Sequence, residues 1–563
     1  MIDHTQPWYW LNEESTLFLE RGYLQPGQDA KERVRVIAET AERILGLPGY
    51  ADKLYNYVAR GFISFASPIW SNFGLARGLP ISCFGSYLDD DMASILFSQA
   101  EVGMMSKYGG GTSAYFGDLR ERGAVITNNG HSSGPVHFMQ LFESILDVVS
   151  QGAVRRGTFT AYLPVEHPDI LEFLEIGAEG NPIQKMTYAV TVTDAWLEAM
   201  KDGDEDKRAI WAKILQRRRE IGYPYIMFSD TANRNTVDVY KDKGLPINAS
   251  NACGEIMLPS TKDASFVCCL SSINLLHYEE WKNTDLVETM IQLLDAVMSE
   301  FIEKLEQLRD STDSQHQQAF RFMERAYNFA KNHRAVGLGV LGWHSYLQSN
   351  NIDFMSEKAG KLNVEIFKDI RTQANDASKN LAQRLGEPEL LVGHGRRNAT
   401  LLAIAPTTSS GFILGQVSQG IEPVWSNCYV KDLAKTKVTI KNPFLMELLE
   451  KKGINTKEIW RSIRDNDGSV QHLVELTDAE KAAFRTFGEI DQSVIIEQAA
   501  VRQQYIDQGQ SLNITISPDM PIKDVNELYL QAWRQGVKSL YYQHSKNAAQ
   551  QFNRSKLCRS CEA

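Results

Sequence analysis

Three residues in the segment SNACGEIMLPS, residues 250–260, have side chains that could do chemistry together. Asn251, Cys253 and Glu255 are spaced two residues apart and are separated by small residues. If the segment is extended, an amide, a thiol and a carboxylate leave the same face, because side chains alternate along a strand. A carboxylate within hydrogen-bond distance of a reacting group can act as a general base. The spacing therefore predicts a row of reactive groups on one strand face.

The chain ends in a CxxC pair, Cys558 and Cys561 in LCRSC. Two thiols on a terminal segment can form a disulfide and exchange it with another disulfide. A structural zinc site needs four ligands, and the nearest histidine is His544, so we expect no zinc here. Two incidental cysteines are the alternative, although exposed thiols are liable to oxidation.

The other five cysteines lie inside the chain, at positions 83, 253, 268, 269 and 428. Cys83 lies in PISCFGSYLDDD and Cys268 in FVCCLSSINL, and the sequence alone does not show that they meet. A buried cysteine usually acts as a small hydrophobic residue. We assign that role to Cys428 and to Cys269, which would face opposite to Cys268 on a strand.

Other stretches combine glycines, hydroxyls or phenols. APTTSSG (405–411) follows an apolar run and, at the start of a helix, would offer hydroxyls and backbone N–H groups to an anion. The alternative is an ordinary cap or turn. The Gly- and Arg-containing loops 107–123 and 150–162 match neither a P-loop nor the dinucleotide fingerprint. Tyr541 and Tyr542 are adjacent, which fits either a strand with one tyrosine on each face or a redox pair.

The surrounding sequence predicts the elements that position these residues. Apolar spacing predicts one helix after Ser133 as cap, with Pro135 in its first turn, and another over 284–308 with Thr284 as N-cap. Strand-like runs lie between such helices, at 265–275, 335–343, 399–406 and 510–517. Alternating strands and helices predict an α/β architecture with a largely parallel sheet. Residues 430–500 are more polar, and we expect a peripheral helical segment there.

Composition excludes several classes of protein. The 563 residues carry a formal charge of −11 and no long basic run, so we expect no duplex nucleic-acid binding. The sequence shows no signal peptide and no apolar stretch of about 18 residues, so we expect no membrane span. Sparse cysteines are typical of a cytoplasmic protein, and the cytoplasm would be the host's if the chain is phage-encoded.

Six motifs in order resemble one family, the catalytic (large, alpha) subunit of class I ribonucleotide reductase. They are NACGEI, VCCLSSINL, APTTSS, QGIEP, SLYYQ and CRSC, which lie between residues 251 and 561, and the resemblance as a whole extends from about residue 60 to the C-terminus. The resemblance implies a ten-stranded α/β barrel of two five-stranded parallel halves with a central finger loop. It implies a short helical segment at 1–60, the barrel at 61–545 and a redox-active tail at 546–563.

The resemblance also implies a reaction, the radical-based reduction of ribonucleoside diphosphates to 2′-deoxyribonucleoside diphosphates for DNA synthesis. Cys253 would become the thiyl radical, with Glu255 as base and Asn251 orienting the substrate. Cys83 and Cys268 would supply the electrons. The tail cysteines Cys558 and Cys561 would restore that pair from thioredoxin or glutaredoxin.

Partners and ligands follow from the same resemblance. Tyr541 and Tyr542 would bring the radical from a separate beta subunit that holds the radical metallo-cofactor, whereas this chain would ligate no metal. Substrate would contact the residues Ser67, Ser82, Pro406, Thr407, Thr408, Ser409 and Ser410. A dNTP or ATP effector with Mg²⁺ would bind at the interface of a homodimer, on the residues Asp90, Ser94, Arg120, Gln151 and Arg155. Arg122 competes with Arg120 for one position in this match.

The sequence departs from many members of this family at its N-terminal end, and two other functions are alternatives. The segment that precedes SPIW is short and resembles a helical lead-in to the barrel, not an ATP cone, so we expect no shut-off by dATP through a cone. A catalytically silent nucleotide-binding regulatory homologue is one alternative, but it would not need all these cysteines and tyrosines. A plain thiol–disulfide oxidoreductase is the other, but it would carry its CxxC at a helix start.

Overall fold

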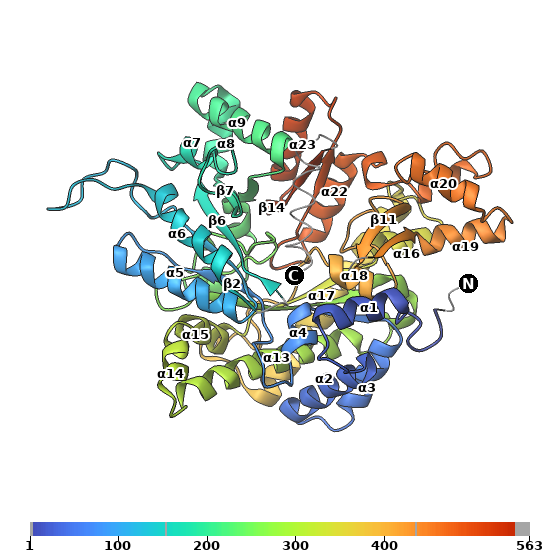
Figure 1. Cartoon of the computed structure of the whole chain (residues 1–563), viewed down its shortest axis with the longest axis horizontal. Coiled ribbons are helices and arrows are strands. Elements are labelled where there is room, and N and C mark those ends of the chain that lie inside the picture. The colour runs from blue at the N-terminus through green and yellow to red at the C-terminus, as the bar shows by residue number, and fades with distance from the viewer. Residues whose placement is uncertain (1–3, 152–154, 434–435, 546–563) are drawn as a thin grey trace.

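The computed structural model describes residues 4–151, 155–433 and 436–545, and Figure 1 shows their arrangement. The first described residues form the helices α1 (Glu13–Gly22), α2 (Ala30–Leu45) and α3 (Tyr50–Ala59). The carboxylate of Asp29 caps α2 by accepting the backbone N–H groups of Lys31 and Glu32. One face of α2 is buried against the long helix α13 (Leu286–Arg309), and α1 packs on α18 (Thr408–Ile413). These helices therefore belong to the main hydrophobic core.

One half of the sheet consists of five parallel strands that pair in chain order. They are β2 (Cys83–Ser86), β3 (Gly111–Tyr115), β6 (Thr158–Pro164), β7 (Thr187–Val192) and β8 (Tyr225–Phe228). Their connections contain α5 (Met92–Lys107), α6 (Pro135–Val148), β4 (Ser150–Gln151), β5 (Arg155–Arg156), α7 (Ile170–Phe173), α8 (Asp194–Asp202) and α9 (Glu205–Ile221). The predicted α/β barrel with a five-stranded parallel half is confirmed.

The second half begins at β9 (Phe266–Asn274), which pairs antiparallel with β2 and with β1 (Ile63–Phe65) and parallel with β10 (Val336–Leu341). The predicted strand 399–406 meets β10 through an isolated bridge between Leu338 and Leu402 and through backbone hydrogen bonds, such as the one from the Leu338 N–H to the Leu401 carbonyl at 2.7 Å. A continuous strand does not form, because the carboxylate of Asp507, far along the chain, accepts the N–H groups of Leu401 and Leu402, at 2.8 Å each. A full strand prediction over 399–406 was therefore wrong.

The remaining elements are short strands, helices and 3₁₀ turns outside the parallel half of the sheet. The run 510–517 contains β13 (Ile514–Ile516), which pairs with β15 (Gln543–Ser545), and β14 (Ser539–Leu540) pairs with β8. The helices are α10 (Ser229–Arg234), α11 (Asp238–Asp242), α12 (Tyr278–Trp281), α14 (Ser314–Arg321), α15 (Glu324–His333), α16 (Trp343–Ser349), α17 (Glu357–Leu385), α22 (Gln492–Gln503) and α23 (Ile522–Arg534), with α4 (Ser67–Asn72) after β1. Short 3₁₀ turns are η1 (Leu275–His277), η2 (Glu389–Leu391) and η3 (Phe487–Glu489).

Two predicted helices are present, but their predicted caps were wrong. The N-cap of α6 is Gly134, with φ 80°, and not Ser133. A Cβ on Gly134 would lie 2.7 Å from the Asp169 carboxylate. Only glycine fits there, because it tolerates positive φ and has no Cβ. The N-cap of α13 is Asp285, while the Thr284 hydroxyl accepts the Leu286 N–H at 3.3 Å.

A lobe with its own small core lies at the right edge of Figure 1, away from α5 and α6. It contains the hairpin β11 (Cys428–Leu433) and β12 (Thr436–Lys441) and the helices α19 (Pro443–Lys451), α20 (Lys457–Asp465) and α21 (Asp478–Ala483). The peripheral segment predicted at 430–500 is present as far as α21, with a hairpin added to its helices, whereas Phe487 and α22 pack in the main core. No helix within the described ranges has the length and apolar character that crossing a membrane requires.

Candidate active site

The segment with Asn251, Cys253 and Glu255 lies on a buried loop between α11 and β9, and it is not a strand. Gly254 has φ 78°, and its N–H points at the Asn251 carbonyl at 3.3 Å. The chain therefore turns there, at a residue type that tolerates positive φ. The Asn251 side chain accepts the N–H groups of Glu255 and Ile256, at 3.1 and 3.2 Å. The extended geometry expected from the spacing was therefore wrong, and the three groups are brought together by a turn.

Residues from the last third of the described chain hold this loop in place. The Ser511 hydroxyl lies 2.6 Å from the Cys253 carbonyl and 3.0 Å from a Glu255 carboxylate oxygen. The Gly509 N–H donates to the Glu255 carbonyl at 2.7 Å, and the Ser539 hydroxyl donates to the Gly254 carbonyl at 2.8 Å. Sequence analysis missed these supports, although Ser511 lies in the strand-like run 510–517 and Ser539 in the motif SLYYQ, because neither pattern indicates a contact with the loop.

A cavity of about 150 Å³ collects most of the predicted catalytic and substrate residues. Its lining includes Ser67, Ser82, Cys83, Asn251, Cys253, Glu255, Cys268, Pro406, Thr407, Thr408, Ser409 and Ser410. These residues come from α4, β2, β9, the buried loop and the start of α18. Segments far apart in the sequence thus contribute to one site.

Cys83 and Cys268 lie directly opposite each other on the antiparallel strands β2 and β9. Directly opposed residues have Cα atoms about 4.5–5.5 Å apart, which is within the range of about 4.4–6.8 Å that a disulfide needs. An amide group contacts each sulfur. Asn251 Nδ2 lies 3.8 Å from Cys83 Sγ, and Gln508 Nε2 donates to Cys268 Sγ at 3.5 Å. The pair is therefore placed to form a disulfide inside the cavity, and Gln508 is a further contact that sequence analysis missed.

Burial changes the acid–base behaviour of the site. Glu255 is 1% exposed, and burial raises the pKa of its carboxyl to about 7, against the opposing effect of hydrogen bonds from its own backbone, Asn251 and Ser511. Burial also raises the pKa of the Cys268 thiol well above its usual value, while the Gln508 hydrogen bond lowers it. Glu255 can therefore exchange a proton near neutral pH, as a general base must.

The segment from Pro406 to Ser410 forms one wall of the cavity. Thr407 has φ 52°, and its hydroxyl accepts the Gly420 N–H at 2.7 Å. Such a backbone conformation is uncommon for a residue with a side chain. The hydroxyls of Ser409 and Ser64 are buried at the cavity and have no hydrogen-bond partner within the described part of the chain. Such orphaned donors are suited to a polar ligand. Ser64 is a cavity residue that sequence analysis missed.

Three of the predicted effector residues lie together outside this cavity. Arg120 Nε donates to the Asp90 carboxylate at 2.6 Å, and the Ser94 hydroxyl accepts the Asp89 N–H at 2.9 Å. Arg122 instead pairs with Glu172, at 2.6 Å, so the structure associates Arg120 with Asp90. Gln151 and Arg155 lie opposite each other in the short β4–β5 pair. The structure describes the backbone of these two residues and not their side chains.

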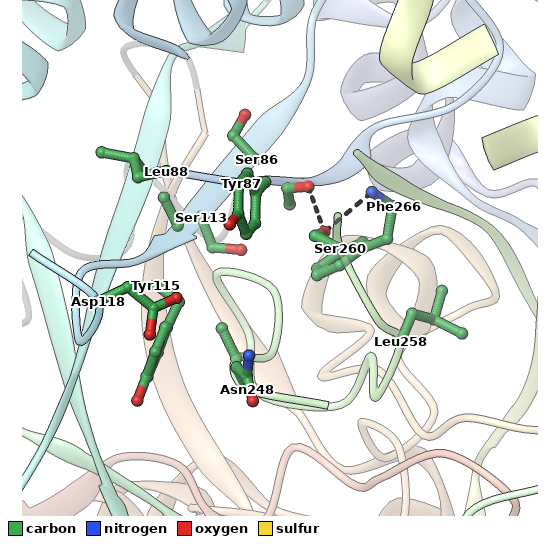
Figure 2. A pocket seen from close by; sticks show the side chains of 13 residues that line it. Ser86, Tyr87, Leu88, Ser113, Tyr115, Asp118, Asn248, Leu258, Ser260 and Phe266 are labelled. Carbon is green, nitrogen blue, oxygen red and sulfur yellow. Dashed lines mark hydrogen bonds between the residues drawn. The ribbon is translucent and has the colours of Figure 1, made fainter. Parts of the chain in front are cut away.

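A second, smaller cavity of about 20 Å³ adjoins the ends of β2 and β3 (Figure 2). Its lining includes Tyr87, Tyr115, Asp118 and Asn248, and it has room for about one water molecule. Ser260 donates to the Gly85 carbonyl at 2.8 Å and accepts the Phe266 N–H at 3.2 Å. Ser260 therefore ties the far end of the buried loop to β2 and β9.

Tyr541 and Tyr542 follow β14, and their rings lie together, with centroids 4.3 Å apart. They do not point to opposite faces as in a continuous strand, because β14 ends at Leu540 and β15 begins only at Gln543. A Cβ on Gly254 would lie 3.8 Å from the Tyr541 ring, so this ring packs against the turn next to Cys253. The tail cysteines Cys558 and Cys561 lie outside the described residues.

The fold is an α/β barrel whose main cavity is lined by three cysteines, and comparison with known proteins identifies the family. The family model for the ribonucleotide reductase barrel domain matches residues 81–207, 205–390 and 388–543. The chain therefore belongs to the ribonucleotide reductase large-subunit family, and the class I resemblance is confirmed.

Individual relatives agree with this assignment. The chain resembles the solved Actinobacillus ureae class Id ribonucleotide reductase alpha subunit, with 56% identity and a TM-score of 0.90 over 96% of this chain and 98% of that one. It is 31% identical to the ribonucleoside-diphosphate reductase large subunit of Invertebrate iridescent virus 3, over 88% of each chain. It is 28% identical to the ribonucleoside-diphosphate reductase large chain of Schizosaccharomyces pombe, over 93% of this chain and 72% of that protein.

Proposed function

We propose that this chain is the catalytic subunit of a ribonucleoside-diphosphate reductase, in which Cys253 starts the reaction and the Cys83–Cys268 pair supplies the electrons. The observation that carries this proposal is that Cys253, Glu255 and the opposed cysteines line one cavity. A nucleotide-binding homologue without radical chemistry would not need a thiol, a carboxyl of raised pKa and a cysteine pair around the same space.

The proposed steps balance in atoms and electrons. A thiyl radical on Cys253 takes the 3′-hydrogen atom of the ribose, and Glu255 takes the proton of the 3′-hydroxyl. The 2′-hydroxyl leaves as water. Cys83 and Cys268 deliver two electrons and two protons in total, one proton to the leaving water and one to the 2′-carbon, and become a disulfide. Glu255 then returns its proton to the 3′-oxygen, and Cys253 returns a hydrogen atom to the 3′-carbon and is again a radical. Asn251 orients the ribose during these steps.

Binding of the ligands would use the remaining predicted residues. The substrate phosphates would bind the Pro406–Ser410 wall, with Ser67 and Ser82 beside the sugar. The effector dNTP or ATP would bind near Asp90, Ser94 and Arg120, with Gln151 and Arg155 relaying its identity, in a homodimer. Its Mg²⁺ would be held chiefly by the effector phosphates, as is usual for this ion, since no group of three or more potential metal ligands occurs among the described residues.

The radical would come from outside the chain, and so would the reductant. A separate beta subunit with a radical metallo-cofactor would oxidise Tyr542, and the radical would pass through Tyr541 to Cys253. The proposed domain division is a helical segment over 1–60, a barrel over 61–545 and a tail over 546–563. Thioredoxin or glutaredoxin would act on that tail in the cytoplasm, where thiols are kept reduced.

The experiment that tests this function is CDP reduction with the beta subunit, a dNTP effector and two alternative reductants. The wild type is expected to form dCDP with thioredoxin and with dithiothreitol. The double variant Cys558→Ser with Cys561→Ser is expected to lose the thioredoxin-supported turnover and keep a slow turnover with the small dithiol, because only the dithiol can reach the cavity. Equal turnover of the double variant with both reductants would disprove the tail role, and no dCDP from the wild type would disprove the function.

A further inference from the structure

Two further tyrosines pack against the adjacent tyrosines of the proposed radical route, and a third packs behind one of them. Tyr223 precedes β8, Tyr225 opens it, and Tyr188 lies on β7. The ring centroids of Tyr223 and Tyr225 lie 5.2 and 5.0 Å from that of Tyr542, and Tyr225 lies 4.5 Å from Tyr541. All five rings are at least nine-tenths buried.

One of these neighbours contacts the reacting atom of the route directly. The Tyr223 hydroxyl donates a hydrogen bond to the phenol oxygen of Tyr542 at 3.1 Å. The backbone fixes this approach, since the Gln543 N–H donates to the Gly222 carbonyl at 3.3 Å. Tyr188 fixes the ring from the other side, stacked on Tyr223 at 5.8 Å with an interplanar angle of 21°. The Tyr223 and Tyr542 hydroxyls are therefore held together by the Gln543–Gly222 backbone hydrogen bond on one side and by the Tyr188 ring on the other.

We propose that Tyr223 is a positioning residue for radical transfer, whose hydrogen bond to the Tyr542 oxygen orients that phenol and stabilises its radical. The inference rests on the proposed function and deepens it. An oxygen that carries an unpaired electron still accepts a hydrogen bond, and a buried, low-dielectric site strengthens such a bond. Without the donor, the Tyr542 radical would be harder to form and less well oriented towards Tyr541.

The steps that Tyr223 assists balance without its own oxidation. Tyr542 loses one electron and one proton to the one-electron oxidant of the beta subunit. The Tyr542 oxygen then takes a hydrogen atom from the Tyr541 hydroxyl, and the Tyr541 oxygen takes one from the Cys253 thiol. Tyr223 keeps its proton throughout and only presents it to the Tyr542 oxygen.

The test places 3-aminotyrosine at position 542, where its easier oxidation traps the radical for electron paramagnetic resonance. The spectra are recorded on the complete enzyme with beta subunit, CDP and effector. In the Tyr223→Phe background we expect a higher gx value, which is the signature of a lost hydrogen bond to the radical oxygen. With tyrosine at 542, Tyr223→Phe is expected to lower kcat for CDP reduction about five- to tenfold, as for the loss of one hydrogen bond, with KM for CDP unchanged.

The matched control is Tyr188→Phe, which removes a hydroxyl from the same cluster and leaves the Tyr223–Tyr542 hydrogen bond in place. Its gx value and kcat are expected to equal those of the unchanged protein. An unchanged gx value in Tyr223→Phe would overturn the proposal, whether or not its turnover falls. If no radical and no dCDP form even with Tyr223 present, the proposed function fails instead.

Discussion

The Cys253→Ala variant is expected to form no measurable dCDP under conditions in which the wild type turns over. In the proposed mechanism the thiyl radical of Cys253 takes the 3′-hydrogen, and alanine offers no bond weak enough to be oxidised to such a radical. Loss of a residue that reacts covalently with substrate costs on the order of 10⁴–10⁶ in kcat in well-studied enzymes. The measurement is CDP reduction with the beta subunit and effector, assayed as deoxycytidine product.

A second cysteine variant makes this result specific. Cys428 is 3% exposed and belongs to the core of the peripheral lobe, so Cys428→Ala also removes a buried thiol but leaves the cavity intact. We expect it to retain full turnover. Thermal unfolding of both variants and of the wild type separates loss of chemistry from loss of folding. Turnover by a folded Cys253→Ala protein would contradict the proposed radical site.

The Glu255→Gln variant is expected to lose about 10²–10⁴ in kcat, the usual contribution of a general base. Glutamine keeps the size and polarity of the side chain but accepts no proton. Because the pKa of Glu255 is about 7, the wild-type kcat/KM is expected to rise as pH increases through 7. The residual activity of Glu255→Gln is expected to lack this rise, and the measurement is a pH–rate profile of both proteins.

The control for the pH profile is another buried carboxyl outside the cavity. Burial also raises the pKa of Glu422 to about 7, so Glu422→Gln removes a group with the same titration range. We expect this variant to keep the rise through pH 7. A rise that persists in Glu255→Gln and disappears in Glu422→Gln would show that Glu255 is not the base.

The free energy of unfolding should fall as pH rises, because of the same carboxyl. The pKa of Glu255 in the folded protein is about 7, above its ordinary value of 4.5, so the folded state binds the extra proton between these pH values. The stabilisation from that proton is complete below pH 4.5 and is lost as pH rises through 7. Relative to the wild type, Glu255→Gln should therefore gain stability above pH 7. The buried base is thus retained for chemistry at a cost in stability.

The sequence predicted the participants of the site better than their geometry. The family resemblance was enough to predict that Cys83, Cys268, Cys253 and Glu255 share one site, which no spacing rule does across segments so far apart in the chain. The turn at Asn251 was missed because the Asn251 side chain accepts the backbone N–H groups of Glu255 and Ile256. Such a local hydrogen bond competes with strand formation. The supports Ser511 and Gln508 were missed because nothing in their own segment marks the distant loop that they contact.

The fold was predictable to a similar extent. The parallel half from β2 to β8 was expected from the family resemblance, because none of the strand-like runs found in the sequence lies in it. The run at 399–406 is interrupted by the carboxylate of Asp507, which lies far along the chain. The clustering of Tyr541 and Tyr542 likewise depends on the break between β14 and β15, which ends the alternation of side chains. These are tertiary contacts, and a local pattern carries no signal for them.

The most direct test of the central claim is a single turnover without reductant, using the Cys558→Ser and Cys561→Ser double variant with the beta subunit, effector and excess CDP. Because the opposed cysteines hold two electrons, we predict about one dCDP per active site. Peptide mapping by mass spectrometry should then find a disulfide between Cys83 and Cys268, which the same sample without CDP should lack. Formation of dCDP while both cysteines stay reduced, or a disulfide between any other pair, would contradict the account.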